Sequence, residues 1–252
     1  MSVPSRHDLA AESLEPMMTS RSGSDSKAVP DPCTVVRGNP HPGRGTVLVL
    51  GVPRGGTSVV AGLCHLLGVS MGLNIDPSNM EDRAFRALRH DSDRIRKAGE
   101  FFEHLRNDRD LAGVKDPALA DWITECYPQV PEPVLVLVTR DVYATAQREE
   151  CAGSDLFASL EEAVRRKYAL FDFVKPLDSP LMLISYERLL VTPLPAVRSL
   201  AQFLVGDVDE QLLARAADLV RPHADMPYEV NFLIARQNYE REESSYAASG
   251  RF

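Results

Sequence analysis

The sequence predicts a three-layer α/β protein, with a central parallel sheet flanked by helices on both faces. Short aliphatic runs, each too short for an ordinary helix, are typical of buried parallel strands. Segments with apolar residues three and four positions apart lie between these runs and predict amphipathic helices. Strands that alternate with helices in this way favour a parallel sheet with right-handed connections. The four strand candidates are residues 46–50, 111–114, 134–139 and 181–185.

The composition divides the chain into three parts. Residues 1–44 hold six of the eighteen prolines and many serines without apolar periodicity, which predicts a flexible leader. An α/β domain is expected over residues 45–235, followed by a polar tail over residues 236–252. A length of 252 residues suits one sizeable core rather than two.

A glycine-rich loop follows the first strand candidate. The loop reads GVPRGGTS over residues 51–58, and apolar residues at helical spacing continue to Leu67. Strand, glycine-rich loop and helix form a phosphate cradle, because glycines let the backbone approach an anion and the N–H groups at the start of the helix point toward it. The alternative is a tight strand-to-helix turn without a ligand, since glycine motifs alone are weak evidence.

The spacing of the loop overlays the nucleotide-binding pattern GxxxxGK[ST], which predicts a P-loop-like fold. Thr57 stands where that pattern has lysine, and the cation of the loop is instead Arg54. Hydrolysis of ATP or GTP in such loops needs the lysine on the phosphates and a hydroxyl on magnesium. The loop is therefore better suited to an anion held by backbone, hydroxyls and an arginine.

The remaining elements follow in chain order. Apolar residues recur near a period of 3.5 over residues 85–105, with charged residues between them, which predicts a long or broken amphipathic helix with a solvated face. Further helices are expected at residues 118–126, 142–149, 156–174, 197–204 and 209–220, and residues 186–190 lead through Pro193 into the fourth of them.

Polar residues follow several strand candidates at their carboxyl ends. Lys115, Arg140 and Tyr186 each come directly after such a run. Ligands of parallel α/β sheets collect at this edge, so we expect these side chains and the loop to converge on one site.

Composition limits the class of partner. A formal net charge of −8 and an isoelectric point near 5.3 argue against a general binder of nucleic acid or anionic membranes, although a basic pocket is still allowed. The four cysteines lie far apart without a CxxC pair, which favours reduced thiols in a reducing compartment. No run approaches the roughly 20 apolar residues of a membrane span, and no signal-peptide segment begins the chain.

Four segments resemble the sulfotransferases that use 3′-phosphoadenosine 5′-phosphosulfate (PAPS) as donor. PRGGTS at residues 53–58 is similar to their 5′-phosphosulfate loop, and GVKDP at 113–117 to their lysine segment. VLVTRD at 136–141 resembles their 3′-phosphate-binding segment, and LISYERLL at 183–190 resembles a further element of the family. The order and separations agree over about residues 46–206.

The resemblance implies roles for individual residues. Lys115 would reach the transferring or bridging oxygens, while Arg140 would bind the 3′-phosphate, with Arg148 replacing the serine that many members carry. The family works without a metal ion, and no metal site is expected here. The 5′-phosphosulfate would be held by Arg54, Gly55, Gly56, Thr57 and Ser58.

Two features depart from the family. Val142 replaces the usual proline after Arg140-Asp141, and Asp116-Pro117 follows the lysine where cytosolic members place a catalytic histidine. Other members use a glutamate after the loop helix as general base, and the acceptor hydroxyl must lose a proton to such a base.

That comparison points to Glu81 as the base, with Asp82 as the second candidate. The competing interpretation is that Ser78 and Glu81 form a capping box that opens the long helix. His90 and His104 are outside candidates for the base.

The function expected from these residues is transfer of a sulfuryl group from PAPS to a hydroxyl or amine of a small molecule or carbohydrate. The soluble, cytoplasmic, bacterial-like members are the better comparison, because membrane-anchored members would show an anchor. Two alternatives stay open: a P-loop kinase or NTPase, and a sulfotransferase-like protein that holds a nucleotide without catalysis.

Overall fold

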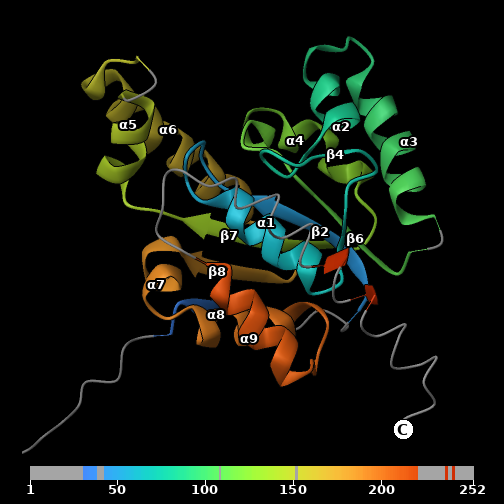
Figure 1. Cartoon of the computed structure of the whole chain (residues 1–252). Helices are drawn as coiled ribbons and strands as arrows, with labels where there is room; N and C mark the ends of the chain where they lie inside the picture. The colour runs from blue at the N-terminus through green and yellow to red at the C-terminus, as the bar shows by residue number, and fades with distance from the viewer. Residues whose placement is uncertain are drawn as a thin grey trace, which may run out of the picture. The chain divides into compact units, whose positions relative to one another are not determined.

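The computed structural model describes residues 31–38, 43–107, 109–150, 153–220, 236–237 and 240–241 (Figure 1). The predicted leader up to residue 30 and most of what is predicted after residue 220 lie outside these residues. The strands are β1 (Cys33–Arg37), β2 (Gly45–Leu50), β3 (Ser70–Met71), β4 (Ile75–Asp76), β5 (Glu81–Asp82), β6 (Leu111–Lys115), β7 (Pro133–Thr139) and β8 (Leu181–Ser185).

The helices alternate with these strands along the chain. Within the described residues, none is both long and apolar enough to cross a bilayer. The helices are α1 (Thr57–Leu66), α2 (Arg83–Ala87), η1 (Leu88–His90), α3 (Arg94–Arg106), η2 (Leu119–Asp121), α4 (Ile123–Cys126), η3 (Tyr127–Gln129), α5 (Val142–Glu150), α6 (Leu156–Val174), α7 (Tyr186–Val191), α8 (Pro193–Leu204) and α9 (Glu210–Asp218).

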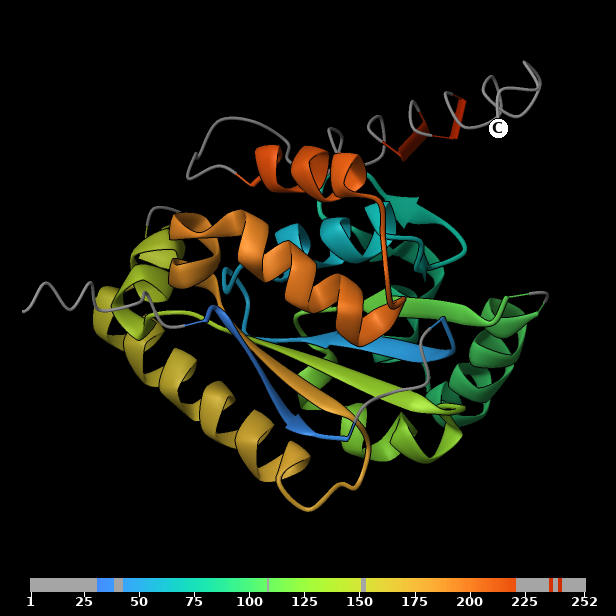
Figure 2. The same cartoon turned by 90° about the horizontal axis from the view of Figure 1, so that it is seen from below.

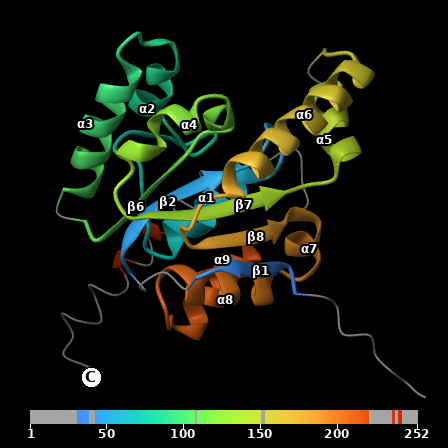
Figure 3. The same ribbon diagram turned by 180° about the vertical axis from the view of Figure 1, so that it is seen from behind.

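The main sheet has six strands in the order β1-β8-β7-β2-β6-β3 (Figure 3). β8, β7, β2, β6 and β3 run parallel to one another, and the edge strand β1 is antiparallel to β8. The loop-bearing strand β2 lies at the centre, between β7 and β6. The predicted parallel sheet is therefore confirmed, with one antiparallel strand added at its edge.

Strand β1 corrects the predicted leader, which extended to residue 44. Thr34, Val35 and Val36 are exposed, so the strand shows no alternation of buried and exposed side chains that a sequence pattern could reveal. It is held by its pairing with β8, and Ser185 N–H also donates to Pro32 C=O at 2.9 Å. The compact unit that contains the sheet begins at Asp31.

Helices cover both faces of the sheet, as predicted (Figure 2). Val47 and Val49 of β2 face the core formed with α1, α7, α8 and α9. Leu48 and Leu50 face the second core, formed with α2, α3, α4 and α6. Because both faces of β2 are buried, its sequence is a continuous apolar run instead of an alternating one.

The segment between α1 and β6 is more irregular than the sequence indicated. The connector expected at residues 69–76 contains the short strands β3 and β4, and the long helix is divided into α2, η1 and α3. Asp82 caps α2, since its side chain accepts from Phe85 N–H at 2.8 Å. Ser78 Oγ instead donates to Asp76 Oδ1 at 2.7 Å, so the predicted capping box is wrong.

The helix predicted over residues 118–126 is also divided. Trp122 has φ −141°, which is outside the helical range and separates η2 from α4. The other predicted helices of the described region lie within a few residues of their expected positions.

Candidate functional site

The loop between β2 and α1 is a tight turn with a left-handed backbone at two positions. Arg54 has φ 58° and Gly56 has φ 87°. Gly55 N–H donates to Val52 C=O at 2.9 Å, and a Cβ at Gly55 would lie 2.7 Å from that oxygen. A non-glycine residue with positive φ stores backbone strain of about 1–3 kcal/mol, and such residues cluster at functional sites.

The N-terminus of α1 carries no cap. Gly56 is the N-cap residue and offers no side chain to the helix. Among the residues that the structure describes, no acceptor meets the backbone N–H groups of Gly56, Thr57 and Ser58. Uncapped N–H groups together with the helix dipole attract an anion.

Lys115 brings a buried ammonium group to this helix terminus. It ends β6, opposite Val49 of β2, and its side chain is only 2 % exposed. Its Nζ lies 3.1 Å from Ser58 Oγ and 2.9 Å from the carbonyl oxygen of Asn79. The sheet register therefore supplies the cation that the loop lacks at Thr57.

Glu81 on β5 completes the surroundings of this lysine. Its Oε1 accepts from Lys115 Nζ at 3.1 Å. Its Oε2 lies 3.6 Å from an Arg86 nitrogen and 3.7 Å from Arg89 NH2. Arg89 also binds both carboxylate oxygens of Asp116, which follows Lys115. Glu81 thus belongs to a charge network at the end of β6.

Asp82, the second base candidate, has a structural role in the fold. Its carboxylate accepts backbone N–H groups from Leu73 at 2.7 Å and Asn74 at 2.6 Å, besides that of Phe85. The residue is 3 % exposed. Both oxygens are engaged in folding the turn before α2.

Arg140 reaches the loop from the end of β7. Its NH1 donates to the Arg54 carbonyl at 2.7 Å, and its guanidinium lies 5.0 Å from the ring centroid of Tyr186. Its Nε is buried without a hydrogen-bond acceptor among the described residues, and the Glu187 carboxylate is 4.0 Å away. A buried N–H group without an acceptor, placed beside the loop, is suited to binding an anion.

Tyr186 packs against the loop from the start of α7. A Cβ at Gly56 would lie 2.2 Å from the ring, so only glycine fits there. The ends of β2, β6, β7 and β8 therefore meet at the loop.

Arg148 makes no contact with these residues in the described part of the chain. Arg148 is exposed on α5 and forms no hydrogen bond or ion pair within the described part of the chain. Its neighbour Glu149 accepts from Arg54 Nε at 3.2 Å.

His90 and His104 are exposed, and His104 Nδ1 contacts the carbonyl of Glu100.

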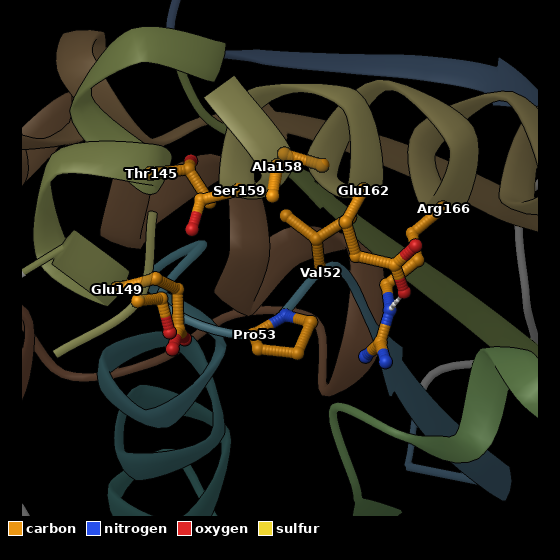
Figure 4. Close-up of a pocket in the computed structure, with 10 residues that line it drawn as sticks. Val52, Pro53, Thr145, Glu149, Ala158, Ser159, Glu162 and Arg166 are labelled. Atoms are coloured by element: carbon orange, nitrogen blue, oxygen red, sulfur yellow. Dashed lines mark hydrogen bonds and ion pairs between the residues drawn. The ribbon is translucent and has the colours of Figure 1, made fainter. Parts of the chain in front are cut away.

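A cavity of about 330 Å³ lies beside the loop, between α5 and α6 (Figure 4). Pro53 and Glu149 lie on one side of it, and Glu162 and Arg166 of α6 lie on another. Glu162 is held by hydrogen bonds from Arg165 and Arg166, which lower its pKa to about 2. The lining residues are Val52, Pro53, Thr145, Glu149, Ser154, Ala158, Ser159, Glu162, Ala163 and Arg166.

Sequence reasoning missed the polar part of this lining. Thr145, Glu149 and Glu162 carry no motif, and the contact between Arg54 and Glu149 joins positions 95 residues apart. Among the described residues, no group of three His, Cys, Asp or Glu side chains is arranged to hold a metal ion.

No protein-family model matches the chain, and no curated protein matches it. The sulfotransferase domain of the Synechococcus PCC 7002 olefin synthase is similar in structure, with a TM-score of 0.50 and 12 % identity over 81 % of this chain and 98 % of that domain. The sulfotransferase domain of the curacin biosynthetic pathway aligns with a TM-score of 0.49 and 13 % identity, over 75 % of this chain and 83 % of that one.

Retinol dehydratase in complex with androsterone and the inactive cofactor PAP aligns with a TM-score of 0.43 and 14 % identity. That alignment covers 70 % of this chain and 64 % of the other. The olefin synthase domain establishes the fold, and the resemblance to sulfotransferases that the sequence motifs indicated is confirmed at that level.

Proposed function

We propose that this protein, a chain with the fold of a sulfotransferase domain, transfers a sulfuryl group from PAPS to a hydroxyl or amine of a small molecule or carbohydrate. The observation that carries the proposal is the uncapped N-terminus of α1, with Lys115 Nζ 3.1 Å from Ser58 Oγ beside it. A buried cation, a hydroxyl and open backbone N–H groups at one point are suited to an anionic group.

The donor supplies an activated sulfuryl group on its 5′-phosphate. In the proposed site, the backbone N–H groups of Gly56, Thr57 and Ser58 bind that end of the donor, and the Ser58 hydroxyl donates to it. Gly55 shapes the turn, because its own N–H closes onto Val52. Arg54 adds a guanidinium from within the loop. The fit is supported by the tight turn and by the N–H groups of Gly56, Thr57 and Ser58 that meet no acceptor in the described chain.

Lys115 would stabilise the negative charge that develops on the bridging oxygen of the donor's 5′-phosphate as the sulfuryl group is transferred to the acceptor. The ammonium is fixed by Ser58, Asn79 and Glu81, so it needs little reorganisation during the reaction. Groups that are held in advance against developing charge give the largest stabilisation of a transition state. Charge supplied by Lys115 and Arg54 makes a divalent ion unnecessary in this proposal.

Arg140 is proposed to bind the 3′-phosphate. Its buried Nε has no hydrogen-bond acceptor among the described residues, and the guanidinium already lies at the loop. Arg148 is proposed as a second phosphate ligand from α5, where its exposed side chain has no competing partner in the described region.

Glu81 is proposed as the general base. With the capping box excluded, the ion pairs of its side chain in the described residues are those with Lys115, Arg86 and Arg89. Oε1 accepts from Lys115, whereas the arginine nitrogens nearest Oε2 lie at 3.6 and 3.7 Å, beyond hydrogen-bond distance, so Oε2 is proposed to take the acceptor proton. Asp82 is unsuitable, because both of its oxygens hold backbone N–H groups.

The body of the acceptor is proposed to bind in the cavity beside Val52 and Pro53 (Figure 4), with its reacting group extending past the loop toward Glu81, which does not line the cavity. A volume of about 330 Å³ is at the small end of the range for small-molecule pockets.

We also propose a cytoplasmic location, because Cys33, Cys64 and Cys126 are free and buried, as expected in a reducing compartment.

A transfer assay tests this function. The protein is incubated with ³⁵S-labelled PAPS, EDTA and a panel of phenols, alcohols, amines and sugars, and Lys115→Met serves as the impaired variant. Labelled product that forms without a divalent ion, and that falls with Lys115→Met, is the expected result. Magnesium-dependent ATP hydrolysis without such transfer would favour the NTPase, and donor binding without turnover would favour the non-catalytic protein.

A further inference from the structure

One ion pair joins the loop to the wall of the cavity. Arg54 Nε lies 3.2 Å from Glu149 Oε1, and Glu149 lines the cavity. We infer that Glu149 is an acceptor-recognition residue that Arg54 masks until the donor binds, and that it selects a small acceptor carrying a positively charged amine. The inference rests on the proposed function, because it assigns Arg54 to the donor.

The ion pair is weak enough to exchange. The side chains of Arg54 and Glu149 are 49 % and 32 % exposed, and exposed pairs of this kind contribute about 0.2–1 kcal/mol. An arginine binds phosphate oxygens through paired, charge-assisted hydrogen bonds, which are about twice as strong as neutral ones. The donor's 5′-phosphosulfate would therefore displace Glu149 from Arg54.

The exchange requires only a side-chain rotation. Arg140 NH1 holds the Arg54 carbonyl at 2.7 Å, and Gly55 N–H closes the turn onto Val52 at 2.9 Å. The backbone of the loop can therefore stay in place while the Arg54 guanidinium moves from Glu149 to the donor. Glu149 remains on α5, with its carboxylate at the cavity wall.

Charges around the cavity then favour a cation. Glu162 is paired with Arg166 and also with Arg165, so its charge is compensated. The Thr145 hydroxyl donates to the Asp141 carbonyl at 2.8 Å. Of the charged lining residues, Glu149 alone would lose its partner when the donor binds. A carboxylate that faces a concave pocket attracts an ammonium group.

The remaining lining describes the rest of the acceptor. Val52, Pro53 and Ala158 present apolar surface, and the volume of about 330 Å³ limits the size of the molecule. A compact apolar body with one amine fits these walls, whereas an acidic acceptor would be repelled by Glu149.

Donor affinity tests the masking without any acceptor. Calorimetric titration with 3′,5′-adenosine bisphosphate compares wild type, Glu149→Gln, Arg54→Ala and the double variant. Glu149→Gln should tighten binding about 1.5- to 5-fold, the range given by an exposed ion pair, and the gain should vanish in the Arg54→Ala background. Glu150→Gln, an exposed neighbour with the same charge change, should leave the affinity unchanged.

The outcomes separate this inference from the proposed function. Bisphosphate that fails to bind the wild type contradicts the proposed function. Bisphosphate that binds equally well to wild type and Glu149→Gln contradicts the masking. A gain in affinity that persists in the Arg54→Ala background would show that Glu149 only repels the bisphosphate by its charge, which also contradicts the masking.

Ligand-observed NMR tests the acceptor class, with tyramine and 4-ethylphenol as probes that differ in the amine. Saturation transfer to tyramine should exceed that to 4-ethylphenol at least about threefold when the bisphosphate is present, and the preference should be lost in Glu149→Gln. Equal transfer to both probes in the wild type, or a preference that survives in Glu149→Gln, would overturn the assignment. Thermal unfolding of the variant verifies that it is folded.

Discussion

Lys115 Nζ lies 3.1 Å from Ser58 Oγ, which joins the end of β6 to the first turn of α1. Lys115→Met keeps the length of the side chain and removes its charge, so we expect transfer to fall by about 10²-fold or more. Stability should fall by about 1–3 kcal/mol, because Arg86 and Arg89 still compensate Glu81. Transfer kinetics and urea unfolding measure the two effects.

Lys175→Met is the matched control for this prediction, because Lys175 is exposed at the end of α6. Lys175→Met should change neither the transfer rate nor the stability appreciably. A Lys115→Met protein that transferred sulfate at the wild-type rate would exclude Lys115 from the chemistry.

Gly56→Ala should disrupt the loop more than a glycine substitution elsewhere. The added Cβ would lie 2.2 Å from the Tyr186 ring, at a backbone with φ 87°. We expect a loss of about 3–5 kcal/mol from strain and overlap, together with weaker bisphosphate binding. Gly153→Ala is the control, since φ is 98° there and no atom lies within 4 Å. It should cost only about 1–2 kcal/mol in urea unfolding, and equal costs would contradict the packing against Tyr186.

Substitutions of the neighbouring carboxylates Asp82 and Glu81 should have different effects. The first should lower stability, and the second should lower transfer. Asp82→Ala removes the acceptor of three backbone N–H groups, so we expect stability to fall by about 2–4 kcal/mol. Glu81→Gln can still accept from Lys115 but cannot take a proton, and transfer should fall by about 10²–10⁴-fold with the fold retained. Urea unfolding and transfer rates of both variants decide this, and a fully active Glu81→Gln would remove the base assignment.

Sequence reasoning located the central strands well, because β2 and β7 are buried on both faces and show continuous apolar runs. It missed β1, whose exposed side chains form no pattern, and the two-residue strands β3, β4 and β5. It offered Ser78 as the helix cap in one of two interpretations, although Ser78 and Asp82 are both common capping residues and only the turn of the chain distinguishes them.

The polar residues at the strand ends could be predicted from topology, because parallel strands bring their carboxyl ends to one edge. The contacts between them could not. Glu149 lies 95 residues from Arg54, and no local pattern signals that pairing or the cavity beside it.

The stability of the fold should depend on pH through His65. Burial, with the nearby Arg236 charge, lowers the pKa of His65 to about 4, from an ordinary value of 6.5. The unfolded chain therefore binds a proton below about pH 6.5 that the folded chain binds only near pH 4, so stability decreases as the pH falls through that window. His65 should account for about 1–2 kcal/mol of the loss between pH 7 and pH 5.

Urea unfolding at the two pH values measures this contribution. His65→Gln should show a correspondingly smaller loss than the wild type, whereas His104→Gln, at an exposed position, should resemble the wild type. Identical losses in wild type and His65→Gln would show that His65 is not the group responsible.

The central claim is that the loop, with Lys115 and Arg140, binds a doubly phosphorylated adenosine without a divalent ion. Calorimetric titration of 3′,5′-adenosine bisphosphate in the presence of EDTA tests it most directly. We predict one site with a dissociation constant on the order of 1–10 µM, weakened at least about tenfold by Arg140→Ala. Absence of binding in EDTA, with binding restored by magnesium, would contradict the claim.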